Sequence, residues 1–150
     1  MQDGDRRPGN RFWDEVFNAG SSDPGRVLDE ILGPEFVLHD LAQQKNWHQQ
    51  DVKRVVGQIR QGLPSARAVI EEDIPALENW EVTRLTLHAN STRPGPAHQQ
   101  VILNATTMSR IEDGRLAETW LLWDEPRATA ELPKPEGSPR GWTWHWPPWW

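Results

Sequence analysis

The sequence contains no cysteine and no tyrosine in its 150 residues. The lack of cysteine excludes disulfides, thiolate zinc sites and catalysis by a thiol. No apolar run approaches the ~18 residues that a membrane-spanning helix needs, so no membrane partner is expected. An excess of basic residues is also missing: the formal net charge is −6, which argues against a nucleic-acid partner. The first ten residues are polar and lack the apolar core of a secretory leader, so we expect a cytoplasmic protein.

The histidine pattern does not predict a metal site. The five histidines are scattered along the chain, and no pair has the H-x-x-x-H or H-E-x-x-H spacing of zinc enzymes. We therefore expect no bound metal.

Hydrophobic periodicity divides the chain into a helical first part and an extended second part. Helical spacing predicts three helices, near residues 10–20, 23–33 and 48–63, with a short strand at 35–40. The period then changes to two, which predicts strands near 66–74, 80–90, 99–111 and 115–124. We expect a flexible segment at 1–9 and one α+β domain at 10–126, in which three helices cover a curved antiparallel sheet. A twisted sheet that is only partly covered leaves an apolar pocket.

Tryptophan and proline are concentrated at the end of the chain. Five of the ten tryptophans lie in the last nine residues, and six prolines lie in the last 25. Proline removes backbone donors and fixes φ, so residues 127–150 are expected to form an extended tail. Exposed indoles promote association. We expect the tail to dock on its own domain, on a partner subunit or over the pocket mouth; a loosely attached end is the alternative.

Three segments together resemble one protein family: "RFWDEVFNAGSSDPGRVLDEILGPEFVLHD", "GLPSAR" and "RIEDGRLAETWLLWD". Over about residues 10–126 the chain is similar to the SnoaL-like polyketide cyclases, and the R-I-x-D-G-R-L-x-E-x-W pattern is the most specific part. The resemblance implies the cone-shaped α+β fold of ketosteroid isomerase and nuclear transport factor 2, a deep pocket, and homodimers or homotetramers formed through the sheet. It also implies ring closure of a natural-product intermediate without cofactor or metal.

The proton-transfer positions of the family are not matched here. The resemblance implies a histidine three residues before the hairpin arginine and an aspartate just after the tryptophan, whereas this chain has Thr107 and Leu121. The family's acid/base pair is therefore not carried over. Strand alternation and the tight turn at Asp113-Gly114 predict that Thr107 lies opposite Leu121.

Three other side chains are candidates for proton transfer. Asp40 ends the strand at 35–40, where relatives of ketosteroid isomerase carry a base; alternatively, it caps the next turn. His88 shares a strand face with Arg84, and the pair lies either in the pocket or on the outer face of the sheet. Asp124 is about 20 Å from Glu118 along one strand, too far for a catalytic carboxylate pair. Glu118 is expected to pair with a basic group across the sheet.

The predicted substrate-binding residues are aromatic or able to donate hydrogen bonds. Aromatic residues at helical spacing also build ordinary cores, and for Trp13 and Phe17 both interpretations hold. The set consists of Trp13, Phe17, Trp47, Trp80, Arg84, Thr107, Leu121 and Trp123.

The sequence thus predicts an enzyme, a cofactor-independent cyclase or isomerase for a small apolar or polycyclic natural-product intermediate. Two alternatives stay open. One is a non-catalytic ligand-binding module with the same pocket. The other, an epoxide hydrolase, is disfavoured because Arg84 is followed by Leu85 and Thr86, so the R-x-D spacing of such enzymes is missing.

Overall fold

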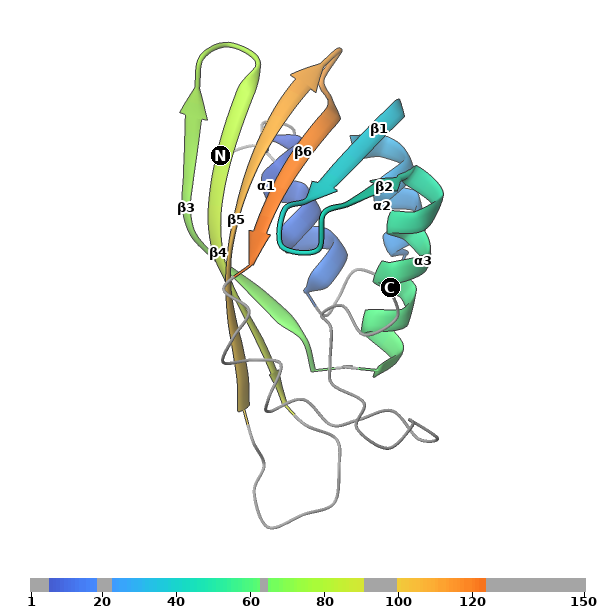
Figure 1. Ribbon diagram of the computed structural model, residues 1–150, viewed down its shortest axis with the longest axis vertical. Coiled ribbons are helices and arrows are strands. Elements are labelled where there is room, and N and C mark those ends of the chain that lie inside the picture. Colours follow the sequence, from blue (N-terminus) through green and yellow to red (C-terminus); the bar gives the residue numbers. More distant parts are fainter. Residues whose placement is uncertain (1–5, 19–22, 63–64, 91–99, 124–150) are drawn as a thin grey trace.

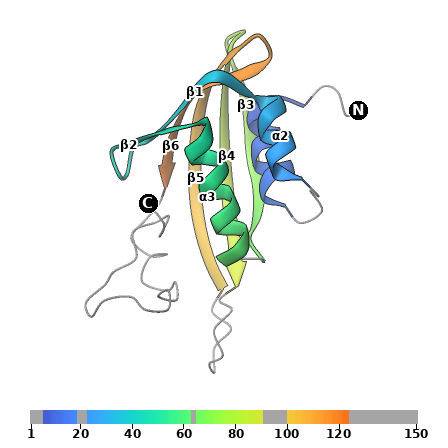
Figure 2. The ribbon, with the colours of Figure 1, turned by 90° about the vertical axis from the view of Figure 1, so that its right-hand side faces the viewer.

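The computed structural model describes residues 6–18, 23–62, 65–90 and 100–123. One curved, open sheet carries the helices on a single face, called here the inner face (Figures 1 and 2). The strand order is β2-β1-β6-β5-β4-β3. The strands are β1 (Leu32–Asp40), β2 (Lys45–His48), β3 (Arg67–Ala76), β4 (Trp80–Asn90), β5 (Gln100–Glu112) and β6 (Arg115–Trp123); the helices are α1 (Pro8–Arg11), which continues as the π-helical turn η2 (Phe12–Val16), α2 (Pro24–Ile31) and α3 (Gln49–Gly62).

The α+β class and the arrangement of three helices on a curved sheet are confirmed, but the sheet is mixed rather than wholly antiparallel. Strands β3 to β6 form the expected antiparallel meander, whereas β1 pairs in parallel with β6. Strand β2 occupies a segment that was expected to be a loop. Only Trp47 of its four residues is buried, so β2 has no alternation that could reveal it.

The β5–β6 hairpin has the predicted register. Thr107 pairs with Leu121, and Glu112 pairs with Arg115 across a two-residue turn. Asp113 and Gly114 have φ values of 51° and 74°. Two successive residues with positive φ match the twist of the flanking strands, which explains the Asp-Gly sequence at this turn.

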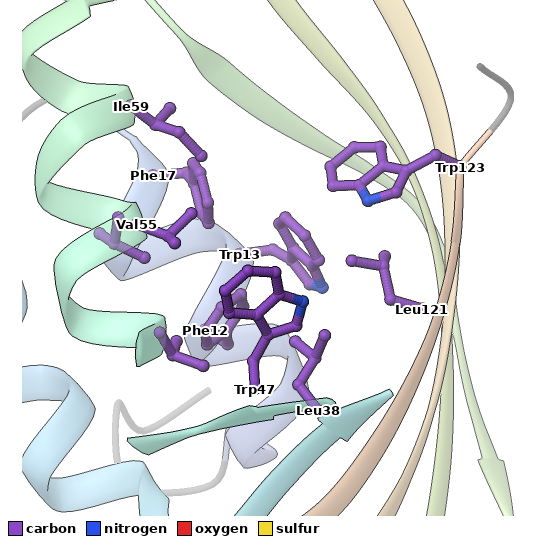
Figure 3. Close-up of a pocket in the computed structure, with 11 residues that line it drawn as sticks. Phe12, Trp13, Phe17, Leu38, Trp47, Val55, Ile59, Leu121 and Trp123 are labelled. Atoms are coloured by element: carbon purple, nitrogen blue, oxygen red, sulfur yellow. The ribbon is translucent and has the colours of Figure 1, made fainter. Parts of the chain in front are cut away.

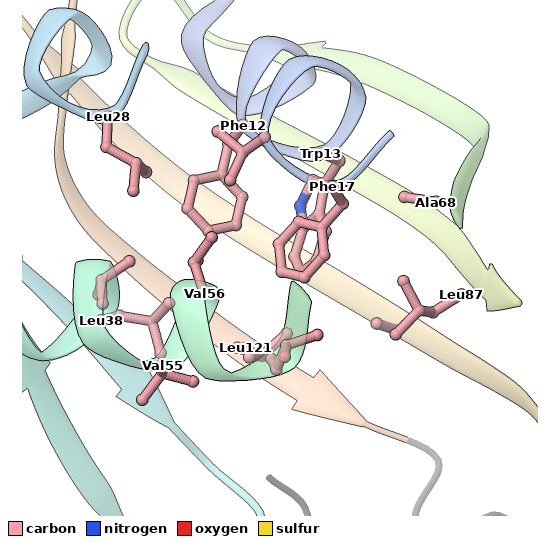
Figure 4. Close-up of a cluster of buried hydrophobic side chains, with 14 of the residues drawn as sticks. Phe12, Trp13, Phe17, Leu28, Leu38, Val55, Val56, Ala68, Leu87 and Leu121 are labelled. Carbon is pink, nitrogen blue, oxygen red and sulfur yellow. The ribbon is translucent and has the colours of Figure 1, made fainter. Parts of the chain in front are cut away.

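Apolar residues of the inner face and of the helices form the core. Leu85 and Leu87 of β4 are at most 1% exposed, and the neighbouring strands add Leu103 and Leu121. Figure 4 shows Phe12, Trp13 and Phe17 between α3 and the sheet. From α3 the core receives Val52, Val55, Val56 and Ile59.

Two helix starts show local and long-range capping. Asp23 caps α2: its side chain accepts a hydrogen bond from the Arg26 backbone N–H at 3.0 Å, and Pro24 occupies the first turn. Helix α1 was expected to begin behind Asn10 but begins at Pro8. Its first N–H groups donate to the carboxylate of Glu81, a residue of β4 that local sequence cannot connect to this helix.

Within the described segments, no helix has both the length and the apolar character needed to cross a membrane.

Candidate functional site: an apolar cavity with a hydroxyl-lined neighbour

An apolar cavity lies between η2, α3 and the inner face of the sheet (Figure 3). Its volume is about 410 Å³ when the space open to solvent is counted, and the centre of a water molecule can occupy about 40 Å³ of it. Every side chain that lines it is aliphatic or aromatic. The lining residues are Phe12, Trp13, Phe17, Leu38, Trp47, Val52, Val55, Val56, Ile59, Leu121 and Trp123.

Aromatic contacts hold the walls of this cavity in place. Trp13 stacks on Phe17 with ring centroids 5.0 Å apart, and it meets Trp123 edge-to-face at 6.0 Å. Phe12 also meets Trp13 edge-to-face, at 4.9 Å. These rings come from the first helical segment and from the end of β6, so packing between a helix and the sheet fixes the shape of the cavity.

A smaller cavity lies beside the first and shares Phe12, Trp13 and Leu38 with it. Its empty space is about 260 Å³, and the centre of a water molecule can occupy about 10 Å³ of it, which is room for about one water-sized atom. Unlike the first cavity, its lining includes residues that bear hydroxyl groups: Thr107, Ser109 and Thr119.

The three hydroxyl-bearing residues of the smaller cavity are almost completely buried. Ser109 Oγ and Thr119 Oγ1 are hydrogen-bonded at 2.9 Å. In the part of the chain that the structure describes, Thr107 Oγ1 has no hydrogen-bond partner. A buried hydroxyl without a partner is unusual in a folded protein.

Most of the predicted substrate-binding residues lie around these two cavities. Trp13, Phe17, Trp47, Leu121 and Trp123 line the apolar cavity. Thr107, directly across the hairpin from Leu121, lines the smaller one. The structure thus places Thr107 and Leu121 opposite each other, as the sequence predicted.

Trp80, Arg84 and His88 lie elsewhere, on the outer face of β4. Their strand positions alternate with Leu85 and Leu87, which face the core. Arg84 is exposed, and its Nε lies 3.3 Å from Oε2 of Glu72. The sequence analysis placed Arg84 and His88 either in the pocket or on the outer face of the sheet. The structure places both on the outer face, so neither side chain lines the cavity.

Asp40 lies at the end of β1. Its side chain caps the turn that follows, which is the alternative that the sequence analysis gave for it. Its Oδ1 accepts the backbone N–H groups of Ala42 and Gln43, each at 3.1 Å. The residue is 1% exposed and pairs in register with Leu121, yet it lines neither of the two cavities.

The outer face carries a network of charged side chains around Glu118. His39 Nε2 lies 2.7 Å from Glu118 Oε1, and Arg110 donates to the other oxygen at 3.4 Å. The hydrogen bond with His39, and then that with Arg110, lowers the pKa of Glu118. The expectation that Glu118 pairs with a basic group across the sheet is confirmed, and its place on the outer face gives it a structural rather than a catalytic position.

Sequence reasoning missed Glu81, the most unusual acid of the inner face. It is 1% exposed, and both carboxylate oxygens accept backbone N–H groups of α1, from Gly9 and Asn10, at 2.9 Å each. Burial, followed by the negative charge of Asp73, raises the pKa of Glu81 to about 7. Alternation could have found it, because residue 81 shares a strand face with Leu85 and Leu87.

Among the described residues, no group of three or more His, Asp or Glu side chains is placed to hold a metal ion. The candidate Asp124 and the proline- and tryptophan-rich tail at 127–150 lie outside those residues.

Comparisons with known proteins agree with this architecture. Residues 9–132 match the family model of the SnoaL-like polyketide cyclases. No curated protein matches the sequence.

Several solved structures share the fold. A candidate SnoaL-like polyketide cyclase from Jannaschia sp. CCS1 is 19% identical, with a TM-score of 0.65 over 78% of this chain and 83% of the other. IdmH, a candidate polyketide cyclase from Streptomyces antibioticus, is 18% identical, with a TM-score of 0.66 over 79% and 93%. A protein from Catenulispora acidiphila with a ketosteroid isomerase-like fold, solved with trimethylamine, is 8% identical, with a TM-score of 0.67 over 84% and 93%. At these identities the likeness shows the fold alone.

Proposed function

The chain belongs to the SnoaL-like polyketide cyclase family, and on that premise we propose that it is a cofactor-independent cyclase or isomerase of an apolar, polyketide-type intermediate. The observation that carries this proposal is the lining of the larger cavity, which consists only of aliphatic and aromatic side chains. Such walls bind and shape a hydrocarbon framework, but they neither accept nor donate a proton.

Catalysis in such a cavity acts mainly through confinement. Holding two reacting carbons of a flexible substrate in contact can lower a barrier by several kcal/mol, up to about 7–11 kcal/mol in the best intramolecular models. The C–H between two carbonyl groups is comparatively acidic, so ring closure of a 1,3-dicarbonyl chain demands less of a protein base than an aldol reaction of a simple ketone. The substrate class that fits Thr107 and Leu121 is therefore a chain with an apolar body that carries one reactive 1,3-dicarbonyl segment.

A second candidate function, a non-catalytic ligand-binding module, is favoured by the same lining, since none of the described residues that line the larger cavity is titratable. An epoxide hydrolase is not favoured, because Arg84, the arginine considered for that reaction, lies on the outer face in an ion pair with Glu72.

The test uses a linear aryl 1,3-diketone ester as the probe substrate. The wild-type protein is expected to bind the probe, as followed by tryptophan fluorescence, and to close the ring by aldol condensation faster than buffer does. The loss of one water molecule in this condensation is followed by mass spectrometry. Val55→Phe adds a ring to the cavity wall and is expected to reduce both binding and turnover, because the cavity has little spare room.

The matched control is Val37→Phe in β1, at a half-buried position on the opposite face from Leu38, which is expected to leave both measurements unchanged. Binding without turnover would favour the binding module. A wild-type protein that neither binds nor converts the probe would contradict the proposal.

A further inference from the structure

On the inner face of the sheet, a group of hydroxyl-bearing side chains lies beside the apolar ones that line the larger cavity. Thr107, Ser109 and Thr119 are each at most 5% exposed and together line the smaller cavity. Ser109 and Thr119 are cross-strand neighbours in register, which places their hydroxyls side by side. Burying a hydroxyl is unfavourable unless it forms a hydrogen bond, so each O–H group of this cluster needs an acceptor.

Two O–H donors of this cluster have no acceptor assigned within the cluster. The bond between Ser109 and Thr119 uses the hydrogen of one hydroxyl, so the accepting hydroxyl keeps its own. The Thr107 hydroxyl has no partner among the residues that the structure describes. The residues that carry these two donors line the smaller cavity, so an acceptor atom placed there is a candidate partner for both.

The position and size of the smaller cavity limit what that acceptor can be. The cavity admits about one water-sized atom and adjoins the apolar cavity at Phe12, Trp13 and Leu38. A single oxygen at the edge of an apolar framework therefore fits, whereas a bulky polar group does not.

Charge favours a neutral oxygen over an anionic one. Among the described residues, no cationic side chain lines the smaller cavity, and Glu81 is the cross-strand neighbour of Ser109. A carboxylate held there would be desolvated without a counter-charge, which is costly. A ketone oxygen accepts two hydrogen bonds without that penalty.

We propose that the hydroxyls of Thr107, Ser109 and Thr119 form a subsite for one neutral ketone oxygen, belonging to a ligand whose apolar body fills the larger cavity. The inference rests on the proposed function, because it requires the larger cavity to accept a ligand. In a cyclase, the same donors would stabilise the negative charge that develops on this oxygen when its carbon is attacked.

The test compares two probes with the same framework, 1-tetralone and its hydrocarbon analogue tetralin, in binding titrations with the full chain. Thr107→Val has nearly the same shape as the wild type but lacks the hydroxyl. We expect it to weaken 1-tetralone binding about 5–10-fold while changing tetralin binding less than about 2-fold. Ser109→Ala is expected to act in the same direction, and the C=O stretching band of bound 1-tetralone is expected at lower frequency in the wild type than in Thr107→Val.

The matched control is Thr106→Val, one residue away on the exposed outer face of β5, which is expected to leave both affinities and the band unchanged. If tetralin binds but Thr107→Val changes neither the affinity for 1-tetralone nor its band, the subsite is overturned and the apolar cavity stands. If neither probe binds the wild type, the proposed function fails and the subsite fails with it.

Discussion

Glu81 joins α1 to the sheet through a carboxyl group that is almost fully buried. Its oxygens accept the N–H groups of Gly9 and Asn10, and its pKa is raised from 4.5 to about 7 by burial and by Asp73. Because the pKa is higher in the folded state, folding favours the protonated acid. The resulting stabilisation is complete below pH 4.5 and is lost as the pH rises through about 7.

We therefore predict that Glu81→Gln reduces the pH dependence of stability. The wild type is expected to lose about 1–3 kcal/mol of unfolding free energy from this group between pH 5 and pH 8. Glutamine resembles the protonated acid and should lose much less. Urea unfolding at the two pH values measures the difference.

The control is Glu72→Gln, an exposed acid on β3 paired with Arg84, which should keep the wild-type slope. An unchanged slope in Glu81→Gln would show that Glu81 is not the titrating group.

The hydroxyl cluster gives a second prediction, about stability in the absence of ligand. Thr119→Val removes the buried hydrogen bond with Ser109 and is expected to lower the unfolding free energy by about 1 kcal/mol. Thr107→Val removes a hydroxyl that has no partner among the described residues, so it is expected to be neutral or stabilising. Thermal unfolding of both variants measures this; an equal loss in Thr107→Val would contradict the assignment of its hydroxyl.

Among the elements, α1 depends most on a single close approach. A Cβ atom added at Gly9 would lie 2.7 Å from Oε2 of Glu81. Gly9→Ala is therefore expected to destabilise the protein by about 1–3 kcal/mol, because the added methyl group separates the buried carboxylate from the N–H groups that it caps. Circular dichroism during urea unfolding measures the change.

Gly57→Ala is the matched control for this prediction. Its Cβ would meet nothing within 4 Å in the middle of α3, so the change is expected to stabilise by about 0.5–1 kcal/mol through helix propensity. If Gly9→Ala were as favourable as Gly57→Ala, the close approach to Glu81 would be ruled out.

These elements also show what sequence can and cannot predict. The cap at Asp23 and the turn at Asp113-Gly114 were predictable because both are local chemistry. The start of α1 and the pairing of β1 with β6 were not, since each depends on a partner more than 70 residues away.

The same distinction holds for the candidate site. Helical spacing found Trp13 and Phe17, and the hairpin register placed Thr107 opposite Leu121. Alternation sorted Arg84 and His88 onto one face of β4 but did not say which face the helices cover. The sequence of β4 does not distinguish the two faces clearly, because the carboxylate of Glu81 lies on the same face as Leu85.

At the scale of the whole molecule, the outer face of the sheet carries apolar side chains beside its charged network. Trp80 stacks on Trp120 with centroids 5.6 Å apart, and exposed Met108 and Leu122 lie on the same face. Neighbouring apolar side chains on a sheet face are typical of a contact with another protein surface. We expect self-association through this face.

Met108→Lys is predicted to weaken that association. A charge at the centre of the face would be desolvated in a dimer, so the population should shift toward monomer in light scattering after size exclusion. Leu77→Lys is the control, because Leu77 is 86% exposed at the β3–β4 turn. A wild-type protein that is monomeric at high concentration would contradict the prediction.

The parallel pairing of β1 with β6 has a consequence for the order of assembly during synthesis. β2 follows β1 after a short turn and can pair with it early, but the other edge of β1 must wait until residues 115–123 leave the ribosome. Such distant pairings slow folding, and a waiting edge can capture other nascent chains. Because β1 precedes the other described strands and its partner β6 follows them, we expect aggregation during synthesis to be most frequent before β6 emerges.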